Sequence, residues 1–395
     1  MKVLYVNHTA QVSGAEHALL ALLAQLPDDV SAVVACPDGP LATAVRGLDV
    51  QVIPVLGTDA SLKLHAIHTP RALVDMARTA YVVRRLARTI RADLVHANSI
   101  RAGVIGLLAQ SAGGPPTAVH LHDRLPPGRL SAVSLKMIAK RAAGILACSE
   151  YVLAQLPPSD DGSRLVRVVY NPVDTERFDP KRIDRAAARA DLQLEPSTVA
   201  VGMIAQITPW KGQDDALRIL ARLREQHDNV RLVLAGSPKF VGRGTRYDNV
   251  AFHERLKRLT HSLDVEEHVT WLGERDDIPE ILSALDIFIA PSWEEPLSIA
   301  VLEAMAMELP VLCTDVGGMT EVIDRECGTL LPPRDPARWA AEMARLIDSD
   351  DLRATIGTRA RERITAELEQ TLYVRRVTET YEDLLRADET PVSES

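Results

Sequence analysis

Two glutamates at an eight-residue spacing are the most informative pair of reactive side chains in the sequence. Glu295 and Glu303 lie in the segment APSWEEPLSIAVLEAMA, in which Pro296 is expected to open a helix. Eight residues span just over two helical turns, so both carboxylates would lie on almost the same face. The first N–H groups of this helix would suit a phosphate, and they belong to Leu297, Ser298 and Ile299. Surface charge is the alternative, but a carboxylate among the apolar residues of AVLEAMA needs a partner.

A lysine stands at a second junction between a strand and a helix. Lys211 precedes Gly212 in VGMIAQITPWKGQDDAL, where a strand, a Pro-Trp turn and a helix follow one another. An ammonium group beside a helix N-terminus can neutralise a departing diphosphate. An exposed loop lysine is the alternative interpretation. The later sequence DVGG brings Gly317 and Gly318 to the same strand-end surface.

Two junctions in the first half of the chain supply further candidates. Gly14 follows the first strand and opens a helix, which suits a diphosphate or an acceptor, although Ser13 as an ordinary N-cap explains the same pattern. His122 and Asp123 stand where a strand ends and a Pro-rich loop begins, so His122 can contact sugar hydroxyls or a donor phosphate. His120, on the same strand face, is a rival, and a structural histidine is the alternative for both.

Short β-rich runs alternate with helix-length segments along the chain. Most of these runs are continuously apolar, as in parallel strands that are covered on both faces. The rhythm occurs twice and predicts an α/β fold with two doubly wound, Rossmann-like domains facing a cleft. The expected strands are 2–6, 31–36, 50–55, 93–97, 117–122, 144–149 and 165–170, then 199–205, 230–236, 268–273, 286–291, 310–314 and 328–331.

The expected domain boundary lies in YNPVDTERFDP, where Pro172 and Pro180 interrupt both periods. We expect an N-terminal domain over residues 1–175 and a C-terminal domain over 176–365. After about Asp335 no further strand is expected. A helix over 366–386 would return to the first domain, and 387–395 would form a flexible tail.

Composition excludes several classes of function. The 395 residues carry a net charge of -9, and no basic patch with interleaved aromatics is present, so nucleic acid is not an expected partner. The four cysteines contain no C-x-x-C pair, which gives no sign of a zinc or redox motif. Without a signal-peptide core or a spanning apolar run, a cytoplasmic protein is expected.

An arginine-rich segment suggests a peripheral contact. Residues 71–91, RALVDMARTAYVVRRLARTIR, would form a helix that lies against anionic lipid or an anionic acceptor. A solvated helix face is the alternative. The contact would be peripheral, on the inner face of the membrane.

At these residues the chain resembles the retaining glycosyltransferases of family four, which adopt the two-Rossmann-domain B-type fold. The resemblance covers nearly the whole length, and its most specific element is the E-x(7)-E segment EPLSIAVLE. Weaker elements fall in the right order, namely SGAE, HD, NPVDTERF, PWKG, LAG and LGERDDIPEILSALDIFIAPS.

The resemblance implies a role for each candidate. Transfer would proceed from a UDP- or GDP-sugar to a hydroxyl acceptor, either lipid-linked, polymeric or a small metabolite, without a metal or other cofactor. The reaction centre would use His122, Lys211 and Glu295. The donor would be held by Gln206, Lys211, Glu295, Leu297, Ser298, Ile299 and Glu303. The acceptor side would comprise Gly14, Glu16, His122 and Asp123.

Two positions depart from the family pattern. Gln206 stands where many members carry an arginine, and Leu297 and Ser298 replace a frequent Phe-Gly pair. The first departure keeps a non-catalytic nucleotide-sugar-binding protein as an alternative, beside a nucleotide-sugar epimerase of the same fold. An NAD-dependent oxidoreductase is disfavoured because no G-x-G-x-x-G follows the first strand.

Overall fold

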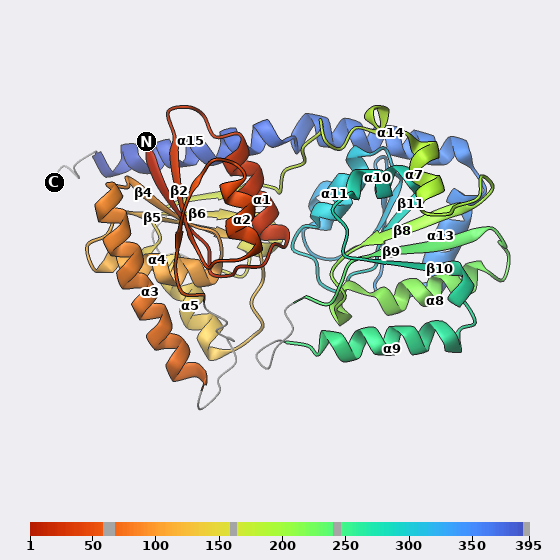
Figure 1. Cartoon of the computed structure of the whole chain (residues 1–395), viewed down its shortest axis with the longest axis horizontal. Coiled ribbons are helices and arrows are strands. Elements are labelled where there is room, and N and C mark those ends of the chain that lie inside the picture. The colour runs from red at the N-terminus through yellow and green to blue at the C-terminus, as the bar shows by residue number, and fades with distance from the viewer. Residues whose placement is uncertain (58–67, 159–163, 240–245, 390–395) are drawn as a thin grey trace. The chain divides into compact units, whose positions relative to one another are not determined.

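Every segment that the sequence predicts as a strand pairs in one of two parallel sheets (Figure 1). The structure is a computed structural model and describes residues 1–57, 68–158, 164–239 and 246–389. The chain divides into two compact units, Met1–Pro172 with the segment from Gln370 onward, and Val173–Glu369. The expected α/β fold with two doubly wound sheets is confirmed.

The first unit has a seven-stranded sheet in the order β3-β2-β1-β4-β5-β6-β7. Its strands are β1 (Lys2–Val6), β2 (Ser31–Cys36), β3 (Gln51–Pro54), β4 (Leu94–Ala97), β5 (Thr117–Leu121), β6 (Gly144–Ala147) and β7 (Leu165–Val168). Its helices are α1 (Gly14–Ala24), α2 (Pro40–Arg46), α3 (His68–Ile90), α4 (Ile100–Ser111), α5 (Arg129–Arg141), α6 (Glu150–Leu153) and α15 (Gln370–Glu389).

Helices cover both faces of this sheet. One face packs against α1, α2 and α15 and forms a hydrophobic core with them (Figure 1). On the other face, α4 packs between α3 and α5 and directly against β5. Close packing explains two helix glycines in α4, because a Cβ at Gly103 would lie 2.7 Å from Val119 and one at Gly106 2.7 Å from Thr117.

The second unit has a six-stranded sheet in the order β10-β9-β8-β11-β12-β13. Its strands are β8 (Val199–Ile204), β9 (Val230–Ala235), β10 (Val269–Gly273), β11 (Ile287–Ala290), β12 (Val311–Thr314) and β13 (Thr329–Leu331). Its helices are α7 (Arg185–Asp191), α8 (Gln213–Leu223), α9 (Asn249–Ser262), α10 (Ile278–Ala284), α11 (Ile299–Ala306), α12 (Met319–Val322), α13 (Pro336–Ile347) and α14 (Asp350–Glu367), with short 3₁₀ turns at Pro180–Arg182, Pro209–Lys211 and Glu266–His268. A hydrophobic core lies between the sheet and α8, α9 and α13.

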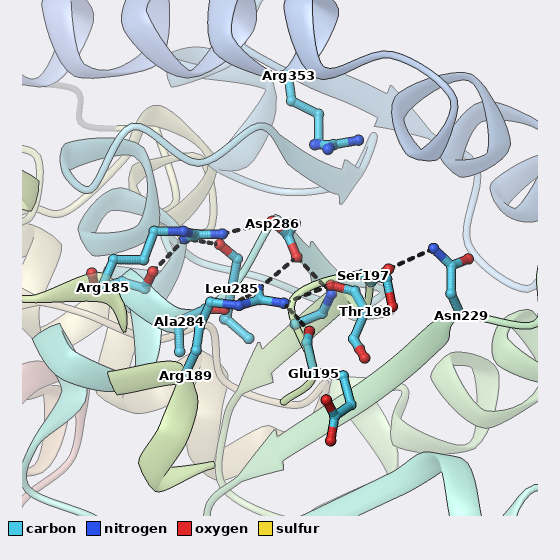
Figure 2. Close-up of polar contacts among 12 residues, drawn as sticks. Arg185, Arg189, Glu195, Ser197, Thr198, Asn229, Ala284, Leu285, Asp286 and Arg353 are labelled. Atoms are coloured by element: carbon cyan, nitrogen blue, oxygen red, sulfur yellow. Dashed lines mark hydrogen bonds and ion pairs between the residues drawn. The ribbon is translucent and has the colours of Figure 1, made fainter. Parts of the chain in front are cut away.

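A carboxylate at the amino ends of β8 and β11 attaches α7 to this sheet. Figure 2 shows the Asp286 carboxylate between the guanidinium groups of Arg185 and Arg189, at 2.6 and 3.1 Å. Asp286 also accepts the backbone N–H of Ala200 at 2.7 Å. Arg189 and Asp286 leave only 13% and 14% of their side chains exposed, so this pair is largely removed from water. It fixes the edge of the sheet opposite to the strand ends described below.

The chain returns to the first unit four residues later than expected. The helical stretch is broken at Leu368 and Glu369, so α14 ends at Glu367 in the second unit and α15 begins at Gln370. At the break, Val173 donates its N–H to the Leu368 carbonyl and pairs with Glu369. Extended pairing therefore replaces helix there. α15 also extends to Glu389, into the segment 387–395 expected as a tail, while 390–395 lie outside the described residues.

Candidate functional site

The second sheet reverses its order between β8 and β11, and the loops after these two strands carry the donor-side candidates. Gln206 and Lys211 follow β8, and Glu295 follows β11. In open parallel sheets the carboxyl ends of the strands diverge at such a reversal and leave a crevice for a ligand. The sequence candidates of this unit therefore lie at the edge of the sheet where ligands bind.

Lys211 and Glu295 form a short ion pair across these loops. The Lys211 Nζ lies 2.7 Å from Glu295 Oε2, with 14% and 4% of the two side chains exposed. The Ser292 hydroxyl donates to the same carboxylate oxygen at 3.0 Å. The Trp210 ring lies 4.3 Å beneath the ammonium and adds a cation–π contact. The Lys211 side chain is thus fixed by the ion pair and the ring contact and is largely buried, and the interpretation as an exposed loop lysine is disfavoured.

Two glycines allow these loops to approach each other. Gly212 and Gly317 have φ values of +78° and +65°, in the left-handed region. A Cβ at Gly212 would lie 2.1 Å from the Pro291 carbonyl oxygen, and one at Gly317 1.9 Å from that of Glu295. The Gly318 N–H donates to the same Glu295 oxygen at 3.0 Å. The sequence DVGG therefore supports the Glu295 loop, as its position after a strand suggested.

The expected start of the helix at Pro296 is wrong. α11 begins at Ile299, with Ser298 as its extended N-cap residue. The Ser298 N–H donates to the Met319 Sδ at 3.3 Å, so it is not available to a phosphate. The physical reason is that the Glu295 carbonyl, which a helix starting at Pro296 would pair with the Ile299 N–H, accepts the Gly318 N–H instead. Leu297 is buried, at 4% exposure, and Ile299 opens the helix.

Glu303 lies in the second turn of α11, among apolar side chains. Burial raises the pKa of its carboxyl group to about 8, and the charge of Arg177 opposes the shift. A carboxyl group with this pKa is mostly protonated at neutral pH. Hydrogen bonds donated to the ionised carboxylate by a ligand would lower this pKa.

Gln206 is fixed through its backbone rather than through its side chain. Its carbonyl oxygen accepts the Gln213 Nε2 at 2.9 Å. Its side-chain Oε1 is buried and has no hydrogen-bond partner among the described residues. The position thus offers a buried amide where a cation was expected from the family pattern.

In the first unit, polar side chains follow three neighbouring strands. Asn7 follows β1, Asn98 follows β4 and His122 follows β5, at the point where the order of this sheet reverses. His122 Nε2 lies 3.2 Å from Asn98 Oδ1, and Asn98 Nδ2 donates to Asn7 Oδ1 at 3.2 Å. Asn7 Nδ2 donates to Glu16 Oε1 at 3.2 Å. The three strand ends and α1 are therefore joined by one hydrogen-bond chain.

Glu16 is engaged inside the protein. Its carboxylate accepts the backbone N–H and the hydroxyl of Ser13 at 3.1 and 3.0 Å, so the N-cap interpretation of Ser13 is supported. The side chain is buried, at 2% exposure, and burial raises its pKa. Gly14 is exposed at the start of α1. Of these two residues, only Gly14 offers its surface to an acceptor.

The two histidines of β5 and its end differ in their surroundings. His120 is 1% exposed and packs against His96, His122 and Tyr373. His122 is 6% exposed, and burial lowers its pKa to about 4, opposed by a hydrogen bond of the ring to Asn171. Asp123 is exposed, and its charge helps to raise the pKa of Glu16. His120 is therefore a core residue, and His122 is the one at the strand end.

Two family descriptions divide the chain between them. Glycosyltransferase Family 4 matches residues 12–177, and Glycosyl transferases group 1 matches residues 184–363. The chain belongs to glycosyltransferase family 4. The residues that the sequence assigns to the donor all lie within the segment matched by the second description, 184–363.

Relatives and solved structures agree with this assignment. A D-inositol 3-phosphate glycosyltransferase of Salinispora arenicola is 30% identical over 294 residues, which are 68% of this chain and 64% of that protein. One of Mycobacterium sp. (strain KMS) is 30% identical over 63% of this chain and 57% of that protein. The match spans less than two thirds of the length of these curated relatives.

Among solved structures, Anabaena HepE in complex with UDP-glucose superposes with a TM-score of 0.83 at 24% identity, covering 97% of this chain and 100% of that one. A glycosyltransferase from Rickettsia africae gives 0.80 at 19%, covering 97% and 98%. At these identities the superpositions show that the fold is shared.

Sequence reasoning missed several residues that the structure joins to the candidates by hydrogen bonds. Asn7 and Asn98 were not singled out, although each is the first polar residue after a buried strand, which is the feature that identified His122. Ser292 was also missed. Among the described residues, no three His, Cys, Asp or Glu side chains are placed to hold a metal ion. Over the same part of the chain, no helix has the length and hydropathy to span a bilayer.

Proposed function

We propose that the chain transfers a sugar from a nucleotide diphosphate sugar to an acceptor hydroxyl, with retention of the anomeric configuration and without a metal. The proposal is carried by the Lys211–Glu295 pair at the reversal of the second sheet, 2.7 Å apart and nearly buried. An ammonium group at this edge matches the need of a departing diphosphate for a preorganised positive charge.

In the proposed step, the bond between the anomeric carbon and the diphosphate oxygen breaks and its electron pair remains on the diphosphate. Lys211 receives this charge, with a contribution of about 3 kcal/mol to the barrier, the size typical of one preorganised donor. The acceptor hydroxyl bonds to the anomeric carbon from the leaving-group face, and its proton passes to the diphosphate. Glu295 lies beside the sugar, and Glu303 accepts hydrogen bonds from the ribose.

We propose a UDP-sugar as the donor, because the superposed HepE structure is a complex with UDP-glucose. For the acceptor, the names of the relatives favour a phosphorylated polyol such as D-inositol 3-phosphate. A lipid-linked or polymeric hydroxyl is the other class of acceptor to be assayed.

Release of nucleoside diphosphate from a panel of UDP- and GDP-sugars, with and without each acceptor, tests the activity. Acceptor-dependent release is expected, and Lys211→Ala should lower its rate at least about tenfold, in line with the loss of one charge-stabilising group. Lys257→Ala is the matched control, since Lys257 is an exposed residue of α9 paired with Glu254. Equal rates for the two variants would contradict the role of Lys211.

A non-catalytic nucleotide-sugar-binding protein is the second candidate. The observation that favours it is Gln206, whose buried amide oxygen has no partner in the described part of the chain. Such a protein would bind UDP-sugars without releasing UDP in the presence of any acceptor. Interconversion of the donor sugar without an acceptor would instead identify an epimerase.

We propose α3 as a peripheral contact for an anionic bilayer. Its exposed side chains mix apolar and basic groups, Val74, Arg78, Tyr81, Val82 and Arg85. Apolar side chains can enter the interface while arginines meet anionic head groups. Co-sedimentation with vesicles containing phosphatidylglycerol, but not with pure phosphatidylcholine vesicles, is expected, and Tyr81→Ala with Arg85→Ala should abolish it. Equal sedimentation with both kinds of vesicle, for the wild type and the variant alike, would contradict the contact.

A further inference from the structure

Trp293 connects the two loops that carry the donor-side candidates. It lies two positions before Glu295, and its backbone N–H donates to the Trp210 carbonyl oxygen at 2.8 Å. Trp210 directly precedes Lys211. The indole Nε1 donates to Asp215 Oδ2 at 3.2 Å, in the first turn of α8. One residue of the loop after β11 therefore holds both the turn before Lys211 and the helix after it.

Arg334 holds the indole from a third loop, the one after β13. Its guanidinium carbon lies 3.4 Å from the centre of the Trp293 ring, a stacked cation–π contact. The same guanidinium pairs with Asp214 at 3.1 Å and lies 3.6 Å from Asp215. Arg334 has a φ of +62°, in the left-handed region that side chains disfavour. Such a backbone persists where surrounding contacts hold it, and here the indole and the two carboxylates do so.

Two arginines share these carboxylates, but they differ in their contact with the indole. Asp214 and Asp215 leave 14% and 5% of their side chains exposed, and Arg218 pairs with them at 2.7 and 3.3 Å. Burial raises the pKa of Asp215, and the hydrogen bond from Trp293 is among the contacts that lower it. Among the described residues, Arg334 and not Arg218 lies over the Trp293 ring. The two arginines therefore form a matched pair for a test of this contact.

The glycines of these loops permit their close approach but do not maintain it. Gly212 and Gly317 are needed because a Cβ at either position would meet a carbonyl oxygen, yet glycine gives the backbone its greatest conformational freedom. A link that spans the loops limits this freedom. A displacement of about 1 Å at a reaction centre can cost about 100-fold in rate, so the position of the Lys211 ammonium has to be maintained.

We propose that Trp293 is a positioning residue, which keeps the Lys211 ammonium where a donor diphosphate would meet it. It acts through the Trp210 carbonyl and α8, while Arg334 and Asp215 keep the indole itself in place. In this role Trp293 touches no reacting atom. The inference rests on the proposed function, because the diphosphate as the ligand of Lys211 is itself a proposal.

Calorimetric titration of the full chain with UDP tests whether Trp293 acts through Lys211. Trp293→Leu should weaken UDP binding about tenfold, as for the loss of the lysine contact itself. Adding Lys211→Met to Trp293→Leu should weaken it little further, because the displaced ammonium has already lost its ligand. Two independent effects would instead multiply to about 100-fold, and this outcome would overturn the inference. Trp271→Leu, which alters a tryptophan of β10 that packs on His253, is the control and should bind UDP as the wild type does.

A second pair of variants keeps the tryptophan and changes only its cover. Arg334→Met removes the stacked guanidinium from a side chain that is 48% exposed, so the fold of the unit should be retained. Arg218→Met removes an equal charge from the same carboxylates and leaves the indole contact intact. UDP affinity should fall about threefold in Arg334→Met, the size of one exposed cation–π contact, and should not change in Arg218→Met. Equal losses in the two variants would show that charge alone matters and would overturn the inference.

Hydrogen exchange in the ligand-free chain gives a readout that does not depend on any activity. Arg334→Met should speed exchange in peptides covering 205–213, and Arg218→Met should not. If this difference appears while neither the wild type nor any variant binds UDP, the proposed function fails and the positioning role of Trp293 stands. If the two variants exchange alike while Lys211→Met still weakens UDP binding, the proposed function stands and the inference fails.

Discussion

At the scale of single residues, Lys211, which we propose to contact the donor diphosphate, is already paired with a carboxylate. Lys211 shares its charge with Glu295 at 2.7 Å, so a diphosphate must compete with a carboxylate for the ammonium. The carboxylate both positions the lysine and weakens the attraction that it offers to an anion. The balance between the two effects can be tested by neutralising Glu295.

Glu295→Gln should tighten the binding of UDP while slowing transfer. An amide keeps the shape of the carboxylate but gives up the charge-assisted bond, so UDP affinity should rise about fivefold, equivalent to roughly 1 kcal/mol. Calorimetric titration with UDP measures the affinity, and UDP release measures the rate. Weaker UDP binding in Glu295→Gln would show that Glu295 serves mainly to position the lysine.

The raised pKa of Glu303 predicts a dependence of stability on pH. Burial raises this pKa from 4.5 to about 8, so between these values the folded chain holds a proton that the unfolded chain has released. The stabilisation from this proton is complete below pH 4.5 and is lost as the pH rises through 8. The thermal stability of the wild type should therefore fall relative to that of Glu303→Gln as the pH rises from 5 to about 8.5. Curves that stay parallel over this range would contradict the assigned pKa.

Some candidate site residues could be predicted from the sequence and others could not, because the two groups depend on contacts of different range. Lys211 and Glu295 could be found because each stands in a strand–turn–helix context that can be read locally. Asn7 and Asn98 could not, because their roles depend on partners 91 residues apart that only the sheet brings together. The orientation of His122 follows from the same distant contacts.

At the scale of elements, propensity and tertiary support compete at the start of α11. Proline is favoured at the first position of a helix, which is why the sequence predicts a start at Pro296. Gly317 and Gly318 hold the Glu295 loop in place, and the helix begins only at Ile299. The strands were predictable because their continuous apolar runs reflect burial on both faces.

The Asp286 cluster should stabilise the second unit without contributing to the site. Asp286→Ala leaves Arg189 buried without its carboxylate, which should cost about 3 kcal/mol in unfolding free energy. UDP affinity should not change, because Asp286 lies at the amino ends of the strands. Chemical denaturation and calorimetry measure the two quantities. Glu362→Ala, which breaks an exposed pair with Arg359, is the control, and an equal loss of stability there would contradict the role of burial.

At the scale of the whole molecule, the last helix completes the first unit. α15 buries Val377 and Leu384 in the core of that unit, and Tyr381 donates to or accepts from His96 Nδ1 at 2.7 Å. The helical C-terminal part, with a last helix that returns to the first unit, was predictable because no strand pattern follows Asp335. The break at Leu368 was not, because it depends on pairing with Val173, some two hundred positions earlier in the chain.

Removing α15 should therefore unfold the first unit and spare the second. In a chain ending at Glu369, we expect loss of the unfolding transition of the first unit and increased proteolysis within residues 1–172. The second unit should keep its own transition and its affinity for UDP, because Lys211, Glu295 and Glu303 all lie within it. Limited proteolysis with mass spectrometry shows which part survives, and protection of the first unit would contradict this role of α15.

We propose that Lys211 receives the diphosphate of the donor, and calorimetric titration of the full chain with UDP measures this contact. Lys211→Met keeps an unbranched side chain of similar length and removes the charge over Trp210, while Lys257→Met makes the same change on the exposed face of α9. We expect at least about tenfold weaker binding of UDP by Lys211→Met, the loss expected for one charged hydrogen bond, and unchanged binding by Lys257→Met. Equal affinity for UDP in the wild type and Lys211→Met would contradict it.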